Sequence, residues 1–191
     1  MNALMPFDEL NTFKTVQLPT HFENGKIKSE EDLEDIIDEL LDLFLLSYAQ
    51  GLTLTNADLS TDIAPELGDV MRVIDREVAG KTWRERVRDY YENGGTEADI
   101  VRIAETEAHR DSNEAAYETA RKAGATTKIW RTMLDDRVRD QHSYLEGVEV
   151  GLDDEFYTYL GNKAMFPGQF GVAEEDVNCR CWVTYGKEKT T

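Results

Sequence analysis

The residues best suited to chemistry in this sequence lie in two short stretches far apart along the chain. The first runs from Lys128 to His142 and holds one of the three histidines among closely spaced charges. The second, Asn178 to Cys181, holds both cysteines. His142, Cys179 and Cys181 are ligand types that suit zinc. Because only three good ligands can be counted, two arrangements stay open: a zinc site, and two small buried thiols beside a hydrogen-bonding histidine.

The spacing of the cysteines argues against a disulfide between them. Cys179 and Cys181 are separated by one residue, and positions this close rarely reach disulfide geometry without strain. We therefore expect them to be free thiols or metal ligands. The sequence predicts no cofactor, apart from zinc if the three ligands form a metal site.

The stretch around His142 also holds the ingredients of acid–base or nucleophilic catalysis. Ser143 follows the histidine directly, and Glu146 lies close in sequence. No motif fixes a nucleophile, a base and an oxyanion donor together. We therefore predict no catalytic residues and a protein that is not an enzyme, and keep an enzyme as the alternative.

Arginines and acids alternate in the same stretch. Arg137 and Arg139 lie close enough to Asp135, Asp136 and Asp140 to form ion pairs within the turn, or across to Glu107. A buried arginine needs such partners. The alternative is a patch facing phosphate or DNA, formed by Arg137 and Arg180. The neighbouring acids are Asp135, Asp136 and Asp140.

The overall charge limits the classes of partner. The 191 residues carry a formal net charge of −18, and residues 1–100 hold 22 acidic but only 9 basic side chains. Such a surface repels a phosphate backbone, so free binding to duplex DNA is not expected as the main activity. The charge favours a basic protein partner.

Membrane insertion and secretion are not expected. No apolar run approaches the roughly 20 residues needed to span a bilayer, and the N-terminus has Asp8 and Glu9 early and no basic start. The sequence predicts a protein made and kept in a cytoplasm.

Helical spacing of apolar residues dominates the chain before residue 125. Ser29 with Asp32 predicts a capped helix start, and Gly51 is predicted to end that helix. Further helices are expected between residues 58 and 93. Thr96 caps a long helix that ends at Gly124. The inner face of the first helix is predicted to be Leu33, Ile36, Ile37, Leu40, Leu41, Phe44, Leu45 and Tyr48.

Strand patterns appear only after residue 126. Alternation predicts strands at Thr127 to Met133, at Val148 to Val150 and at Arg180 to Tyr185. The fold class is therefore α+β, a mainly helical N-terminal part followed by a small unit with a few short strands. The predicted divisions are an N-terminal arm at 1–28, a helical region at 29–125 and a small α+β module at 126–191.

A series of residues between 103 and 181 keeps the order and spacing of a known family. These residues include Glu107, Trp130, Asp136, Arg137, Arg139, Gly147, Asn178 and Arg180. The pattern covers about 80 of the 191 residues and resembles the phage head morphogenesis, or minor head (minor capsid) protein, family, phage Mu F-like. Glu105 departs from it, because the family usually has arginine there. Some relatives carry Cys-x-x-Cys where this chain has Arg139 and His142.

The resemblance implies a structural role in head morphogenesis. It implies partners among portal or other phage head proteins, association with packaged DNA, and a location in the virion and, during assembly, in the host cytoplasm. The relatives with a cysteine pair near His142 imply zinc binding in part of the family. The alternative is a phage-carried nuclease or nucleotide-modifying effector enzyme.

Overall fold

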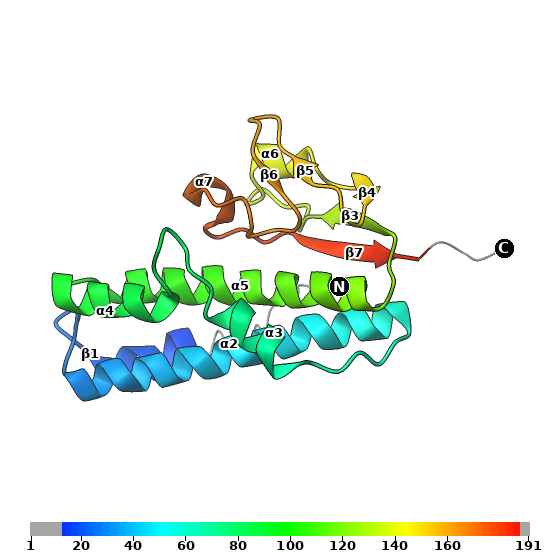
Figure 1. The fold of residues 1–191 in the computed structure, drawn as a ribbon. Coiled ribbons are helices and arrows are strands. Elements are labelled where there is room, and N and C mark those ends of the chain that lie inside the picture. The colour runs from blue at the N-terminus through cyan, green and yellow to red at the C-terminus, as the bar shows by residue number, and fades with distance from the viewer. Residues whose placement is uncertain (1–12, 188–191) are drawn as a thin grey trace.

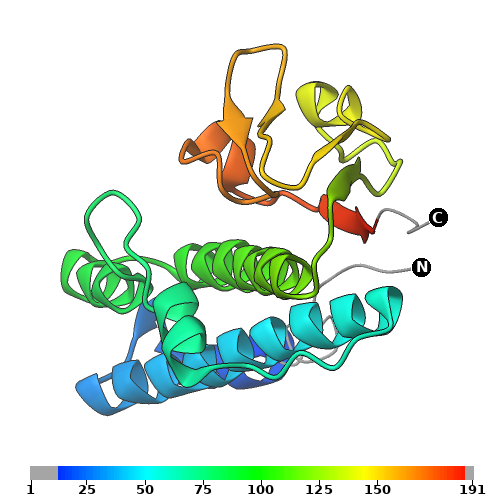
Figure 2. The ribbon, with the colours of Figure 1, turned by 45° about the vertical axis from the view of Figure 1, so that its right-hand side comes forward.

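The computed structural model describes residues 13–187 and is built around two long helices. Helix α2 (Glu30–Leu59) and helix α5 (Glu97–Lys122) lie side by side and run in the same direction (Figure 1). A small unit of short strands packs on the other side of α5, so that α5 lies between two layers (Figures 1 and 2). The α+β prediction is confirmed.

The first helix begins where the sequence predicts but does not end there. The Ser29 hydroxyl accepts the backbone N–H of Asp32 at 3.1 Å, which caps α2. The helix then continues through Gly51 to Leu59. Gly51 is buried against α5, where a Cβ atom would lie 2.0 Å from the carbonyl oxygen of Ser112. The glycine therefore permits close helix packing, and the predicted helix end was wrong.

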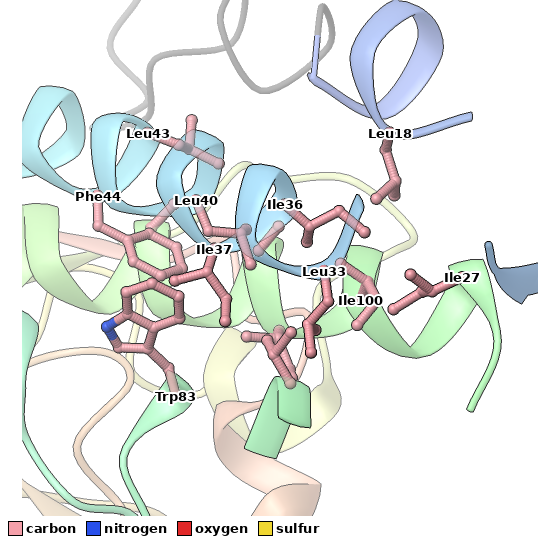
Figure 3. Close-up of a cluster of buried hydrophobic side chains, with 14 of the residues drawn as sticks. Leu18, Ile27, Leu33, Ile36, Ile37, Leu40, Leu43, Phe44, Trp83 and Ile100 are labelled. Atoms are coloured by element: carbon pink, nitrogen blue, oxygen red, sulfur yellow. The ribbon is translucent and has the colours of Figure 1, made fainter. Parts of the chain in front are cut away.

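Apolar side chains of α2 and α5 form the main core (Figure 3). Phe44 meets Trp83 edge-on, with ring centroids 5.0 Å apart. Of the predicted inner face, Leu41 is only partly buried and Leu45 is exposed, whereas Leu43 is buried. The buried members of this core are Leu18, Ile27, Leu33, Ile36, Ile37, Leu40, Leu43, Phe44, Ile74, Trp83, Val87, Ile100, Ile103, Ala104 and Ala108.

Two shorter helices connect the long ones. They are α3 (Leu67–Ile74) and α4 (Trp83–Asn93), in the region where helices are predicted. The predicted cap of α5 is confirmed, since the Asp99 carboxylate accepts both the backbone N–H and the hydroxyl of Thr96 at 2.9 Å. Gly124 ends the helix with a φ of +74°.

The described part of the predicted arm is folded onto α2. Residues 13–28 form a π-helical turn (Phe13–Gln17), a 3₁₀ turn (Leu18–His21) and a hairpin of β1 (Phe22–Glu23) with β2 (Lys26–Ile27). Burial of Leu18 in the main core holds this segment in place. The described part of the predicted arm therefore includes a short hairpin over residues 22–27. Residues 1–12 lie outside the described part.

The C-terminal unit contains a three-stranded antiparallel sheet. Strand β3 (Thr127–Arg131) lies between β4 (Glu149–Gly151) and β7 (Trp182–Gly186), as predicted within two residues. The remaining elements are helix α6 (Asp140–Ser143), strand β5 (Phe156–Tyr157), strand β6 (Lys163–Ala164) and helix α7 (Ala173–Asp176). Within residues 13–187, no helix is long and apolar enough to cross a membrane.

Candidate functional site

The two chemistry-bearing stretches meet in the C-terminal unit. His142 lies on α6, and Cys179 and Cys181 lie on the segment that leads from α7 into β7. The Nδ1 atom of His142 is 3.6 Å from the Sγ atom of each cysteine. All three side chains are buried, and the two cysteines form no disulfide with each other. The structure therefore assembles the three predicted ligand residues in one place.

Glu175 of α7 sets the orientation of the histidine. Its Oε2 atom lies 2.9 Å from Nε2 of His142, and the carboxylate is fully buried. A carboxylate accepts hydrogen bonds, so Nε2 carries the proton and the lone pair of Nδ1 faces the two sulfur atoms. Three further donors reach the same carboxylate, from Gln141 at 3.2 Å, Asn162 at 2.8 Å and Thr158 at 3.4 Å.

Aromatic rings enclose this cluster. Phe170 stacks on the His142 ring with centroids 5.4 Å apart, and Trp130 meets the same ring edge-on at 5.7 Å. Trp130 is fully buried on β3 and also contacts Phe156 at 5.1 Å. The predicted motif residue Trp130 therefore forms one wall of the site.

The pKa values of the two thiols shift in opposite directions. The hydrogen bond from Cys181 lowers the pKa of Cys179 well below its usual value, and the hydrogen bond from His109 acts in the same direction, despite burial. The hydrogen bond to Cys179, together with burial, raises the pKa of Cys181. Cys179 is therefore the more acidic thiol of the pair. His109 comes from α5, where Asn113 Nδ2 lies 3.2 Å from its Nε2 atom.

Other motif residues shape the backbone around the cluster. Arg139 donates to the carbonyl oxygen of Val177 and so ties α6 to the cysteine segment. Asn178 adopts a positive φ of +56°, a conformation that asparagine tolerates better than most residues. Gly147, with a φ of +75°, donates its backbone N–H to the Trp130 carbonyl at 2.9 Å.

The ion pairs of this region differ from those predicted. Asp135 pairs with Arg180, whose hydrogen bond lowers the pKa of the carboxyl group. Arg139 is engaged by a backbone carbonyl, and Arg137 is exposed, as is Asp136. Because Arg180 is neutralised by its partner, the alternative DNA-facing patch of Arg137 with Arg180 loses half of its free charge.

Glu107 belongs to a separate buried cluster between α4 and α5. Its carboxylate pairs with Arg86 at 2.6 Å and not with the arginines near residue 137, as one alternative predicted. Burial, followed by the neighbouring Glu107, raises the pKa of Asp111 well above its usual value. A cavity of about 300 Å³ lies beside this cluster and is lined in part by Arg86, Glu107 and Arg110. Nothing in the sequence pattern indicates that Arg86 pairs with Glu107.

The Ser–His arrangement that would serve catalysis is not formed. One ring nitrogen of His142 faces Glu175 and the other faces the thiols, so neither is left for Ser143, which is exposed. Sequence reasoning found the histidine and the cysteines but missed Glu175 and His109. The run of acids at 174–176 was the only available signal for Glu175.

The match to a known protein family covers the region that contains this site. The family model described as "Phage Mu protein F like protein" matches residues 53–184. The chain is 35% identical over 85 residues to "Minor head protein GP7" of Bacillus phage SPP1, which is 43% of this chain and 28% of that protein. It is 42% identical over 109 residues to "NAD(+)--arginine ADP-ribosyltransferase EFV" of Enterococcus faecalis, which is 53% of this chain and 22% of that protein. Each match therefore spans about a quarter of the relative. No solved structure is significantly similar to the chain.

Proposed function

Because the chain belongs to the Phage Mu protein F like family, whose model covers more than half of it, we propose that it acts as a minor head protein in the assembly of a phage head. The observation that carries this proposal is the family match over residues 53–184, together with the similarity to a phage minor head protein. Its location would be the virion and, during assembly, the host cytoplasm.

The proposed mechanism is binding through the helical layer. Four acids lie at three- and four-residue steps along the exposed side of α2, and within residues 13–187 no ion pair engages them. The first and last of these acids are eleven residues apart, which is about 16 Å along the helix, so the carboxylates form one continuous acidic stripe. The stripe consists of Glu31, Asp35, Asp38 and Asp42.

A basic surface on the portal or on the inner face of the capsid is the partner that fits this stripe. Exposed carboxylates attract such a surface over about one Debye length, roughly 8 Å at physiological salt. Association should therefore weaken as salt rises. Contact with packaged DNA has less support, because the chain is strongly acidic and Arg180 is already paired with Asp135.

The test is capture of head proteins by the tagged chain at low and high salt. We expect portal or capsid protein to be retained at low salt and released at high salt. The stripe variant changes all four carboxylates to the corresponding amides. A matched control makes the same change at four exposed acids of the C-terminal unit, Asp136, Glu149, Asp154 and Glu174.

Both variants remove four negative charges. A difference in binding between them therefore reports where the charges lie and not the net charge of the chain. The stripe variant should lose most of the salt-sensitive binding, and the control should keep it. If the unaltered chain retains no head component at low salt, the proposal fails. Equal loss in both variants would contradict the role of the stripe.

A second candidate function comes from the relative named as an ADP-ribosyltransferase. The identity of 42% over about half of this chain supports an enzyme that uses or modifies nucleotides, although the match spans only 22% of that relative. Incubation of the purified chain with NAD⁺ and with nucleic acid tests this candidate. Consumption of NAD⁺ or cleavage of nucleic acid by the chain, lost in a His142→Ala variant, would favour the enzyme over the binding module.

A further inference from the structure

We propose that His142, Cys179 and Cys181 bind one zinc ion, and that Glu175 holds the histidine in the tautomer that binds it. The proposal concerns the C-terminal unit alone and does not depend on a role in head assembly. Its starting point is that the side-chain atoms of the three residues lie within 4.8 Å of one another. They come from two segments, α6 and the approach to β7.

The spacing of these atoms matches the edges of a zinc tetrahedron. Zinc binds thiolate sulfur at about 2.3 Å and imidazole nitrogen at about 2.0–2.1 Å, which at the tetrahedral angle places nitrogen and sulfur about 3.6 Å apart. Nδ1 of His142 is 3.6 Å from Sγ of Cys179 and 3.6 Å from Sγ of Cys181. The two nitrogen-to-sulfur distances therefore already have the length that a bound zinc ion requires.

The histidine is already in the tautomer that a metal requires. Nε2 donates a hydrogen bond to Glu175 at 2.9 Å, so in the neutral ring Nδ1 offers its lone pair toward the sulfur atoms. Histidines that bind metals almost always donate the other ring N–H to a carboxylate, a carbonyl group or water. Glu175 is held in turn by Gln141, Thr158 and Asn162. These hydrogen bonds hold the buried carboxylate in the position where it accepts the N–H of His142.

His109 is best assigned as a hydrogen-bond donor to the site and not as a ligand. Asn113 Nδ2 donates to Nε2 of His109 at 3.2 Å, so the neutral ring carries its proton on Nδ1. A protonated nitrogen cannot bind a metal but can donate to the sulfur of Cys179. Among residues 13–187, the ligand cluster therefore comprises the three residues named above, and solvent would supply the fourth ligand.

Zinc fits this set better than the hard cations do. Two thiolates and one imidazole are soft or borderline ligands, whereas magnesium and calcium prefer oxygen. The rings of Trp130 and Phe170 pack against the His142 ring and restrict its movement. A bound ion would cross-link α6 to the start of β7 and so stabilise the C-terminal unit by coupling binding to folding.

The test measures metal content and coordination directly. We expect one zinc per chain by native mass spectrometry of the full chain, purified without chelator from zinc-supplemented medium. Replacement by cobalt(II) should give a thiolate-to-metal charge-transfer band and the strong visible bands of a tetrahedral site. The double variant Cys179→Ser and Cys181→Ser should lose both signals.

Two further variants separate metal binding from loss of the fold. Glu175→Gln keeps the ligands and should weaken zinc affinity by about 10–100-fold. His21→Gln is the matched control, because His21 is a buried histidine that lies far away in sequence, beside Asp32 and Glu39; it should keep one zinc. A folded chain that holds neither zinc nor cobalt would overturn the proposal, and so would full zinc content in the double serine variant.

Discussion

Substitution of Gly51 by alanine tests how closely α2 and α5 pack. The added Cβ would lie 2.0 Å from the Ser112 carbonyl oxygen and 2.8 Å from its carbonyl carbon, where ordinary contacts are 3.4–4 Å. Both are backbone atoms of α5, so no side chain can move away to relieve the overlap. The two helices must separate by about 1 Å or more along their central contact.

The cost of this separation exceeds the usual gain from alanine. Overpacking a core typically costs about 1–3 kcal/mol and occasionally more, whereas alanine in place of glycine improves helix propensity by about 1 kcal/mol. Because the clash is with backbone, we expect the upper end of this cost and a net loss of about 2 kcal/mol. For a chain of this length that corresponds to a fall in Tm of about 4–8 °C.

Gly68→Ala is the matched control in thermal melts followed by circular dichroism. Gly68 is an exposed glycine of α3, and a Cβ atom there would meet nothing within 4 Å. We expect this variant to gain about 0.5 kcal/mol and to melt at or slightly above the wild-type temperature. If Gly51→Ala melts within about 1 °C of the wild type, the packing argument is refuted.

Three further predictions concern buried charges, each measured by urea or thermal unfolding. Glu175→Ala removes a buried acceptor that four donors share and should cost about 3 kcal/mol or more. Glu175→Gln should cost less, and equal losses in the two variants would contradict the role of the charge. Arg86→Leu strands the buried Glu107 carboxylate at a cost of about 3–5 kcal/mol, and adding Glu107→Gln should restore part of it; additive losses would rule out the pair. Burial lowers the pKa of Lys128 to about 8, so between pH 8 and 10.5 the unfolded chain binds more protons and wild-type stability should rise with pH. Lys128→Met should be more stable than the wild type at pH 7 and should lose that rise, and a flat wild-type profile would contradict the shift.

Local signals in the sequence were sufficient for most of the secondary structure. A helix cap depends on residues three apart, so Ser29 and Thr96 identify the starts of α2 and α5 without knowledge of the rest of the fold. Strand alternation likewise located β3 and β7. The metal-ligand types of His142, Cys179 and Cys181 were visible from composition alone, because few residue types bind zinc.

Contacts between distant segments decided the rest. Gly51 has the sequence signature of a helix end, but its role is set by α5, which approaches so closely that only glycine fits. Glu175 looks like one of three exposed acids in a row until the fold buries it beside His142. Glu107 finds its partner on α4, 21 residues away. Such pairings depend on how helices and strands pack in space, and neither spacing along the chain nor residue type specifies them.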